Sequence, residues 1–150
     1  MANEESDSIP ESTARMMPDN WLDPLPFDEL FDPDKPLEVD VGSGKGRFLL
    51  ARAAANPRVQ YLGIERMLRR IRKVDRKIQR LGLKNVRLLR AEAAYSVRYL
   101  IPNGSVDVYY VLFPDPWPKK RHIWHRLFNR EFLDAIARTL KAGGLLHVAT

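Results

Sequence analysis

The 150-residue sequence contains no cysteine, which excludes disulfide bonds and thiolate chemistry and is compatible with the cytoplasmic location that we expect. No apolar run approaches the roughly 20 residues of a membrane-spanning helix, so no membrane partner is predicted. The first residues, MANEESDSIPESTA, lack the apolar segment of a secretory signal. Internal repeats are also lacking, and the length suits one domain with a hydrophobic core.

Positive charge is abundant in the sequence, but it is unevenly distributed. Residues 1–36 contain ten Asp or Glu, two Lys or Arg and several prolines, and we expect an acidic, partly flexible N-terminal arm. Residues 37–150 contain 23 Lys or Arg and nine Asp or Glu, and we assign them to one folded domain. A folded region this basic is expected to attract polyanions, and nucleic acid first among them.

From residue 37 onward, short apolar runs alternate with longer segments of helical periodicity. Strands are predicted at residues 37–41, 59–64, 86–89, 106–113 and 145–150, and helices at residues 47–55, 66–81, 93–100 and 130–140. Gly82 is expected to cap the second helix, Asn129 to cap the last one, and Gly143-Gly144 to follow it. This alternation predicts a doubly wound, mostly parallel α/β sheet. Because the sequence ends at the tip of its fifth strand, we expect a truncated domain.

A glycine-rich segment, VGSGKG, follows the first predicted strand. Gly42, Gly44 and Gly46 would let the backbone turn sharply and approach a ligand that a Cβ atom would block. Such glycines are a weak signal alone, since any tight strand-to-helix turn can use them. A nicotinamide-binding domain is one reading, but Arg47 occupies the position where the dinucleotide fingerprint has its third glycine.

Three acidic residues stand near the carboxyl ends of the first three predicted strands. Asp40 lies two residues before the first glycine, and Glu65 ends the second strand, where a carboxylate can accept hydrogen bonds from both hydroxyls of a ribose. Glu92 follows the third strand, within reach of an adenine edge. The pattern therefore indicates a nucleoside-containing cofactor at this edge of the sheet.

Residues 113–122, which read FPDPWPKKRH, follow the fourth predicted strand. Three prolines stiffen the segment around Asp115 and Trp117. Trp117 could stack on a base or form a buried wedge under the turn. The cations that follow are candidates for phosphate contacts: Lys119, Lys120, Arg121 and His122.

Together, DxGxGxG and the acids after strands two and three resemble the class I S-adenosylmethionine-dependent methyltransferases. FPDPWPKKRH closely resembles the signature of the tRNA (guanine-N7)-methyltransferase family, F-[PS]-D-P-W-P-K-K-R-H. The resemblance extends over residues 37–150 and includes DVGSGKGRFLL, GIE, NVRLL, REFL and LKAGGLLHVAT. It implies a Rossmann-like fold, S-adenosylmethionine as cofactor, and transfer of its methyl group to guanine N7 in tRNA.

The resemblance also implies a role for each matching residue. Cofactor contacts would come from Asp40, Gly42, Gly44, Gly46, Glu65, Glu92 and Asp115, and Asp115 would also be the catalytic residue. Substrate RNA would be contacted by Lys119, Lys120, Arg121, His122 and Arg126. Where the family typically has RHxKRR, this sequence has RHIWHR, so Trp124 and His125 replace two basic residues. We expect this departure to affect RNA binding more than methyl transfer.

Guanine N7 carries an in-plane lone pair and needs no deprotonation, so positioning should supply most of the acceleration. Asp115 could stabilise the charge that methylation places on the ring, or accept hydrogen bonds from guanine N1–H and the exocyclic amine. His122 and His125 have no firm third ligand, so no metal is predicted. The chain could be a monomer or a homodimer, or need a second subunit. The alternatives are a catalytically weak or dead RNA-binding module of the same fold and a methyltransferase for another RNA.

Overall fold

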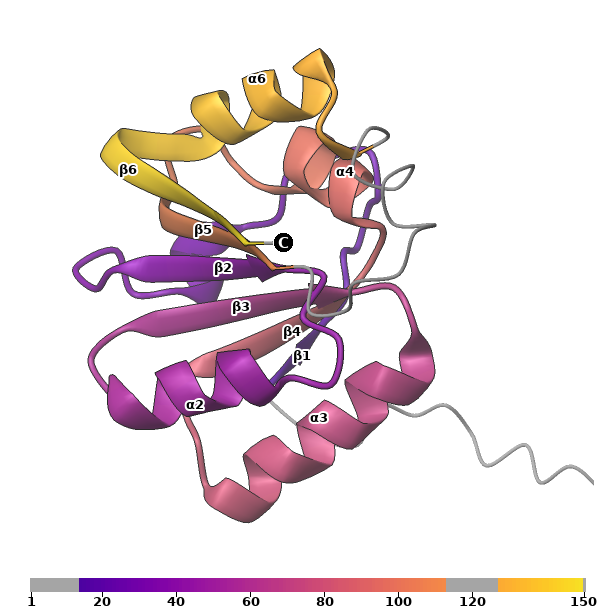
Figure 1. Cartoon of the computed structure of the whole chain (residues 1–150), viewed down its shortest axis with the longest axis vertical. Helices are drawn as coiled ribbons and strands as arrows, with labels where there is room; N and C mark the ends of the chain where they lie inside the picture. The colour runs from indigo at the N-terminus through magenta and orange to yellow at the C-terminus, as the bar shows by residue number, and fades with distance from the viewer. Residues whose placement is uncertain (1–13, 113–126, 150) are drawn as a thin grey trace, which may run out of the picture.

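The computed structural model describes residues 14–112 and 127–149. They form a parallel sheet with the strand order β1-β4-β3-β2-β5-β6 and helices on both faces (Figure 1). The strands are β1 (Arg15–Met16), β2 (Leu37–Val41), β3 (Gln60–Glu65), β4 (Val86–Arg90), β5 (Val106–Leu112) and β6 (Leu140–Ala149). The helices are α1 (Phe27–Leu30), α2 (Arg47–Ala55), α3 (Leu68–Leu81), α4 (Ala93–Tyr95), the π-helical turn η1 (Ser96–Leu100) and α6 (Arg130–Thr139). The predicted doubly wound α/β fold is confirmed.

The direction in which strands are added reverses at β2. The chain runs from β2 outward to β3 and β4, and then adds β5 and β6 on the other side of β2. Residues 38–41 of β2 pair in parallel with residues 61–64 of β3 and residues 108–111 of β5. In doubly wound sheets, the carboxyl ends of the strands at such a reversal form the ligand-binding crevice.

Side chains of β2 alternate between two different environments, as the pleat of a strand requires. Val39 and Val41 enter an apolar core with side chains of η1, β5 and α6. Glu38 and Asp40 face the opposite side, where α2 and α3 pack on β3 and β4 in a second core. Both carboxylates are buried, so polar groups lie under α2 beside the reversal point.

Two of the predicted helix caps are present. The backbone of Gly82 is left-handed, with φ of 64°, and its N–H donates to the carbonyls of Gln79 and Ile78 at the end of α3. The side chain of Asn129 accepts a hydrogen bond of 2.8 Å from the N–H of Phe132 at the start of α6. Both caps therefore follow from local sequence signals alone.

Several elements differ from the sequence prediction, among them the short helix α1, which was not expected. β1 was not expected; its two residues pair with β4 at the edge of the sheet. β6 begins at Leu140, before the expected strand, so Gly143 and Gly144 lie inside it, beside an irregularity in its pairing with β5. The predicted helix at residues 93–100 is divided between α4 and η1. Within residues 14–112 and 127–149, no helix is long and apolar enough to cross a membrane.

The described part of the acidic N-terminal segment, residues 14–36, packs on the domain. The N–H of Leu25 donates to the carbonyl of Leu100 at 2.8 Å, and Leu25 and Phe27 are buried in the first core. Trp21 and Leu22 are exposed. This segment is therefore joined to the body by a few apolar side chains and by the pairing of β1.

Candidate functional site

The turn after β2 has the left-handed geometry for which its glycines are suited. Gly42, Gly44 and Gly46 have φ of 75°, 58° and 74°. The carbonyl of Ile64 accepts hydrogen bonds from the N–H groups of Gly42, at 2.8 Å, and Ser43, at 2.9 Å, which ties the turn to β3. A Cβ atom on Gly46 would lie 2.8 Å from a methyl group of Val74 in α3, so this position also needs glycine for packing.

Glu65, the last residue of β3, is held against this turn. Its Oε2 accepts a hydrogen bond of 3.0 Å from the N–H of Gly44, and its Oε1 accepts one of 3.1 Å from the N–H of Met67. Nη1 of Arg70 lies 3.9 Å from the same Oε1. Two backbone donors therefore fix the orientation of a buried carboxylate, and each oxygen keeps a further lone pair for a ligand.

Asp40 is the second buried carboxyl group of the site, with 4% of its surface exposed. Burial, and after it the negative charge of Glu65, raises the pKa of Asp40 from 3.8 to about 7. Near neutral pH the carboxyl group of Asp40 therefore carries less than one full negative charge. A cationic ligand beside them would favour the ionised form of Asp40.

A cleft of about 310 Å³ opens between the glycine turn, the start of α2 and the end of β5. Its walls include Asp40, Ser43, Phe48, Arg70 and Leu112. The Oγ atom of Ser43 is buried and has no hydrogen-bond partner among residues 14–112 and 127–149. This oxygen lies toward β3, 3.2 Å from the place that a Cβ atom on Gly63 would take, so the cleft offers a ligand mainly the side-chain-free backbone of the glycine turn.

Glu92 occupies a different hollow from the glycine turn. It is the exposed N-cap residue of α4 and lines a space of about 560 Å³ together with Arg66, Ala91, Trp21 and Tyr95. Arg66 directly follows Glu65, so the two hollows adjoin the carboxyl ends of neighbouring strands. The structure thus brings Asp40, the glycines and Glu65 together and places Glu92 one strand further along the same edge.

The remaining predicted site residues, Asp115, Lys119, Lys120, Arg121, His122 and Arg126, lie outside the described residues. The last described residue before them, Leu112, ends β5 and lines the cleft. Ser43 and Arg70 were not predicted as site residues. A hydroxyl between two glycines and a cation on a basic helix carry no distinctive sequence signal.

Glu38, which lies on the same face as Asp40, is bound by neighbouring side chains. Its Oε1 accepts hydrogen bonds from Nη2 of Arg52 at 3.2 Å and from the hydroxyl of Tyr110 at 2.9 Å. Burial and the bond to Glu38 raise the pKa of Tyr110 to about 12. The ring of His147 stacks on Tyr110 with centroids 5.2 Å apart. This network links Glu38 to α2 and β5 beside the cleft, so its carboxylate already has two donors.

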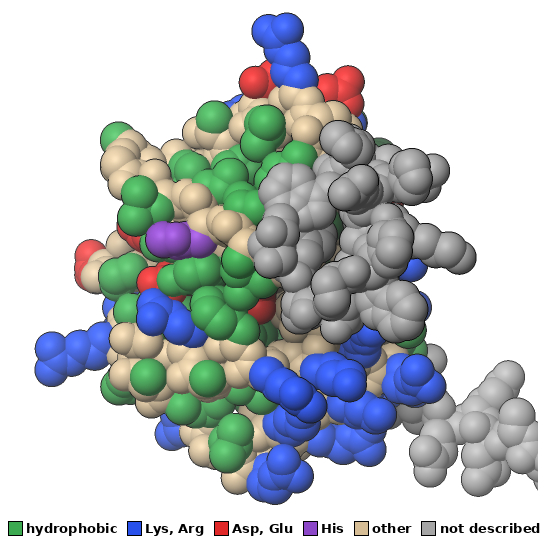
Figure 2. Space-filling view, viewed as in Figure 1, with side chains coloured by type: hydrophobic (Ala, Val, Ile, Leu, Met, Phe, Trp, Pro, Cys, Tyr) green, Lys and Arg blue, Asp and Glu red, His purple; other side chains and the backbone are tan. Residues whose placement is uncertain are grey.

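Positive charge gathers over α3, next to the cleft, where Figure 2 shows a dense group of Lys and Arg side chains. Seven of the fourteen residues of α3 are Lys or Arg. In the described part of the chain, no three His, Cys, Asp or Glu side chains are grouped to hold a metal ion. The cleft itself is lined by one carboxyl group, Asp40, and by the cations Lys45, Arg47 and Arg70, and it borders the basic surface of α3.

A tRNA (guanine-N(7)-)-methyltransferase of Streptococcus mutans is 38% identical over 124 residues, which are 83% of this chain and 58% of that protein. The chain spans about half the length of the curated relatives it matches. The fold of the aminoglycoside resistance methyltransferase NpmB1 superimposes with a TM-score of 0.63 and 26% identity, over 81% of this chain and 59% of that one. A SAM dependent methyltransferase from Aquifex aeolicus gives a TM-score of 0.53 and 25% identity, over 77% and 61%.

These similarities confirm the family resemblance and the class I methyltransferase fold that the motifs predict. A family model described as "Putative methyltransferase" matches residues 34–150, which is most of the chain, and the protein belongs to this methyltransferase family.

Proposed function

We propose that the protein transfers a methyl group from S-adenosylmethionine to N7 of a guanine in tRNA, giving 7-methylguanosine. The observation that carries the proposal is the cleft at the strand reversal, with Glu65 fixed by two backbone N–H groups and β5 ending in its wall. Directly after β5 comes FPDPWPKKRH, the segment that resembles the family signature. Residues 37–150 would form the methyltransferase domain, and residues 1–36 its N-terminal arm.

The residues at the glycine turn fit a nucleoside cofactor. Glu65 is held by two backbone N–H groups in an orientation that lets it accept hydrogen bonds from ribose hydroxyls. Asp40 offers a carboxylate to a cation. When bound, S-adenosylmethionine would supply the electrophilic methyl group. The glycines would hold the ligand close to the backbone, and Glu92 would contact it from the neighbouring hollow.

The substrate residues would come from the segment that follows β5. Asp115 is three residues beyond Leu112, and an extended backbone cannot carry it more than about 11 Å from that residue of the cleft wall. Asp115 would hold the guanine and stabilise positive charge on its imidazole ring. Lys119, Lys120, Arg121, His122 and Arg126 would contact RNA phosphates. No residue needs to remove a proton from N7, so geometry is the main requirement.

The proposal is tested by incubating unmodified tRNA with the protein and S-adenosylmethionine and analysing the nucleosides by mass spectrometry. We expect 7-methylguanosine, and a loss of roughly 100-fold or more in the rate for Asp115→Ala, comparable to removal of one electrostatic stabiliser. Asp134→Ala is the matched control, because Asp134 is an exposed acid of α6. Methylation of another atom would contradict the proposal. Binding of tRNA and cofactor without transfer would favour the catalytically inactive RNA-binding module.

A further inference from the structure

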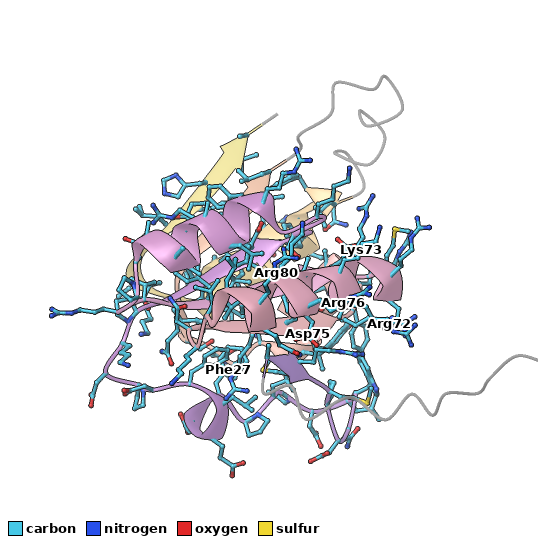
Figure 3. All side chains as sticks on the ribbon, turned by 90° about the horizontal axis from the view of Figure 1, so that it is seen from below. Phe27, Arg72, Lys73, Asp75, Arg76 and Arg80 are labelled. Carbon is cyan, nitrogen blue, oxygen red and sulfur yellow. The ribbon has the colours of Figure 1, made fainter. Side chains whose placement is uncertain are left out.

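The outward side of α3 carries a regular row of cations. Arg69, Lys73, Arg76 and Arg80 are separated by four, three and four residues, so they share one side of the helix. All four are exposed, whereas Ile71, Val74 and Ile78 on the opposite side are buried in the core. Figure 3 shows Lys73, Arg76 and Arg80 along the length of α3. The row extends over about 16 Å at the 1.5 Å rise of an α-helix.

This row of cations destabilises the isolated helix. Like charges three and four residues apart repel one another, and cations in the first turn oppose the helix dipole. The first turn of α3 contains no acidic residue, and the one acid of the helix, Asp75, is buried with 3% of its surface exposed. A polyanion bound along the row would reduce this repulsion. Exposure to solvent alone gives no stabilisation that would favour four cations aligned on one side of the helix.

The row also leads away from the proposed methyl-transfer site. α3 begins three residues after Glu65, and Arg70 in its first turn lines the cleft. Phosphates bound along Arg69, Lys73, Arg76 and Arg80 would therefore belong to a strand that passes the mouth of the cleft. A membrane surface fits less well, because the apolar side of α3 is occupied by the core and cannot insert into lipid.

We propose that Arg69, Lys73, Arg76 and Arg80 form a phosphate-binding track that holds the tRNA backbone while its guanine enters the cleft. The proposal rests on the proposed function for the identity of the RNA. It assigns to these four side chains the sequence-independent part of RNA affinity and no part in cofactor binding. Binding along the track releases counterions from the RNA, so affinity should fall steeply as salt rises.

The test compares two triple variants of equal charge change. The track variant combines Lys73→Gln, Arg76→Gln and Arg80→Gln, and it therefore lacks three cations of the track. The opposite-edge variant combines Lys35→Gln, Arg58→Gln and Lys84→Gln. These three exposed cations precede β2, β3 and β4, so they lie at the amino ends of the strands, opposite the cleft. A third variant, Lys73→Arg with Arg76→Lys and Arg80→Lys, retains the charge. The affinity for unmodified tRNA is measured by fluorescence anisotropy from 50 to 300 mM KCl, with circular dichroism as the check on folding.

We expect the slope of the logarithm of the tRNA association constant against the logarithm of the KCl concentration to become shallower by about two to three in the track variant. This change is close to one for each lost phosphate contact. At 100 mM KCl its affinity should fall by roughly 10- to 100-fold, while the charge-retaining variant binds as the wild type does. Equal slope changes in the track and opposite-edge variants would overturn the proposal, because net charge would then explain both. Tighter binding of phosphatidylserine vesicles than of tRNA would overturn it as well.

Failure of the track and failure of the proposed function give different results. If 7-methylguanosine forms but the track variant binds tRNA normally, the function stands and the track is wrong. If the track variant loses tRNA binding but the wild type makes no 7-methylguanosine, α3 is an RNA-binding surface and the proposed reaction is wrong. Calorimetric affinity for S-adenosylmethionine should be the same in all variants, and its loss in the track variant would contradict the proposal.

Discussion

Ionisation of Asp40 opposes folding of the ligand-free protein, and this effect can be measured. The carboxyl group is buried, and its pKa is raised from 3.8 to about 7 in the folded state. The unfolded chain keeps an ordinary value near 3.9. Between about pH 4 and pH 7 the folded state therefore holds a proton that the unfolded state has lost, and the free energy of unfolding falls as the pH rises. Three pKa units correspond to about 4 kcal/mol, which sets the upper limit of the loss.

Asp40→Asn removes this titration and keeps the shape of the side chain. Between pH 4 and pH 8, the free energy of unfolding of the variant should increase by about 2 to 4 kcal/mol relative to that of the wild type. Urea unfolding of both ligand-free proteins, followed by circular dichroism at intervals of half a pH unit, measures the difference directly. Carboxyl groups that do not interact with Asp40 cancel in this difference, and a pH-independent effect of the amide shifts it equally at every pH. A difference that does not change between pH 4 and pH 8 would refute the reasoning.

The same group should make cofactor binding release protons. A sulfonium ion in the cleft would favour ionised Asp40, so wild type at pH 6.5 should lose a fraction of a proton when S-adenosylmethionine binds. Calorimetry in two buffers of different ionisation enthalpy measures this fraction. S-adenosylhomocysteine lacks the sulfonium charge and should release fewer protons. Equal release by the two ligands would mean that Asp40 does not respond to the sulfonium group.

Three further substitutions test other parts of the site. Glu65→Gln should weaken S-adenosylmethionine binding by roughly 10- to 100-fold in calorimetry, because a neutral amide accepts more weakly from the backbone N–H groups; unchanged affinity would remove Glu65 from the site. Gly46→Ala should lower the free energy of unfolding by about 2 to 4 kcal/mol in urea titrations, because Gly46 has a positive φ and lies close to Val74 of α3. Gly44→Ala should lower it by about 1 kcal/mol, because Gly44 has a positive φ but open space around it. Equal losses would contradict the packing argument. Arg52→Met should cost about 1 kcal/mol of stability by leaving Glu38 with one donor fewer, and it should leave cofactor affinity unchanged in the same calorimetric assay.

The arrangement of the glycine turn beside Glu65 could be predicted because its requirements are local. A glycine turn after an apolar strand, and an acid at the end of the next strand, are visible in the sequence, and parallel pairing brings them to one edge. The backbone donors that fix Glu65 could not be predicted, since they depend on the register of the turn against β3. The role of Glu38 likewise depends on Arg52 and Tyr110, which are 14 and 72 residues away in the chain.

The elements at the edges of the sheet were harder to predict for a different reason. β1 has two residues, too few for any periodicity, and it is a strand only because β4 offers an unpaired edge. β6 runs through Gly143 and Gly144, which ordinarily interrupt a strand, because pairing with β5 accommodates an irregularity there. In both cases a tertiary contact overrides the local preference.

Arg70 belongs both to the wall of the cleft and to the basic helix α3. Its guanidinium lies 3.9 Å from the carboxylate of Glu65, and Arg69, Lys73, Arg76 and Arg80 of the same helix are exposed. α3 begins three residues after Glu65, and the N–H of Met67, directly before the helix, donates to that carboxylate. Residues 65–70 therefore place the proposed phosphate-binding track beside the proposed cofactor site. This geometry is suited to a reaction that depends on holding two large ligands in line and on little other chemistry.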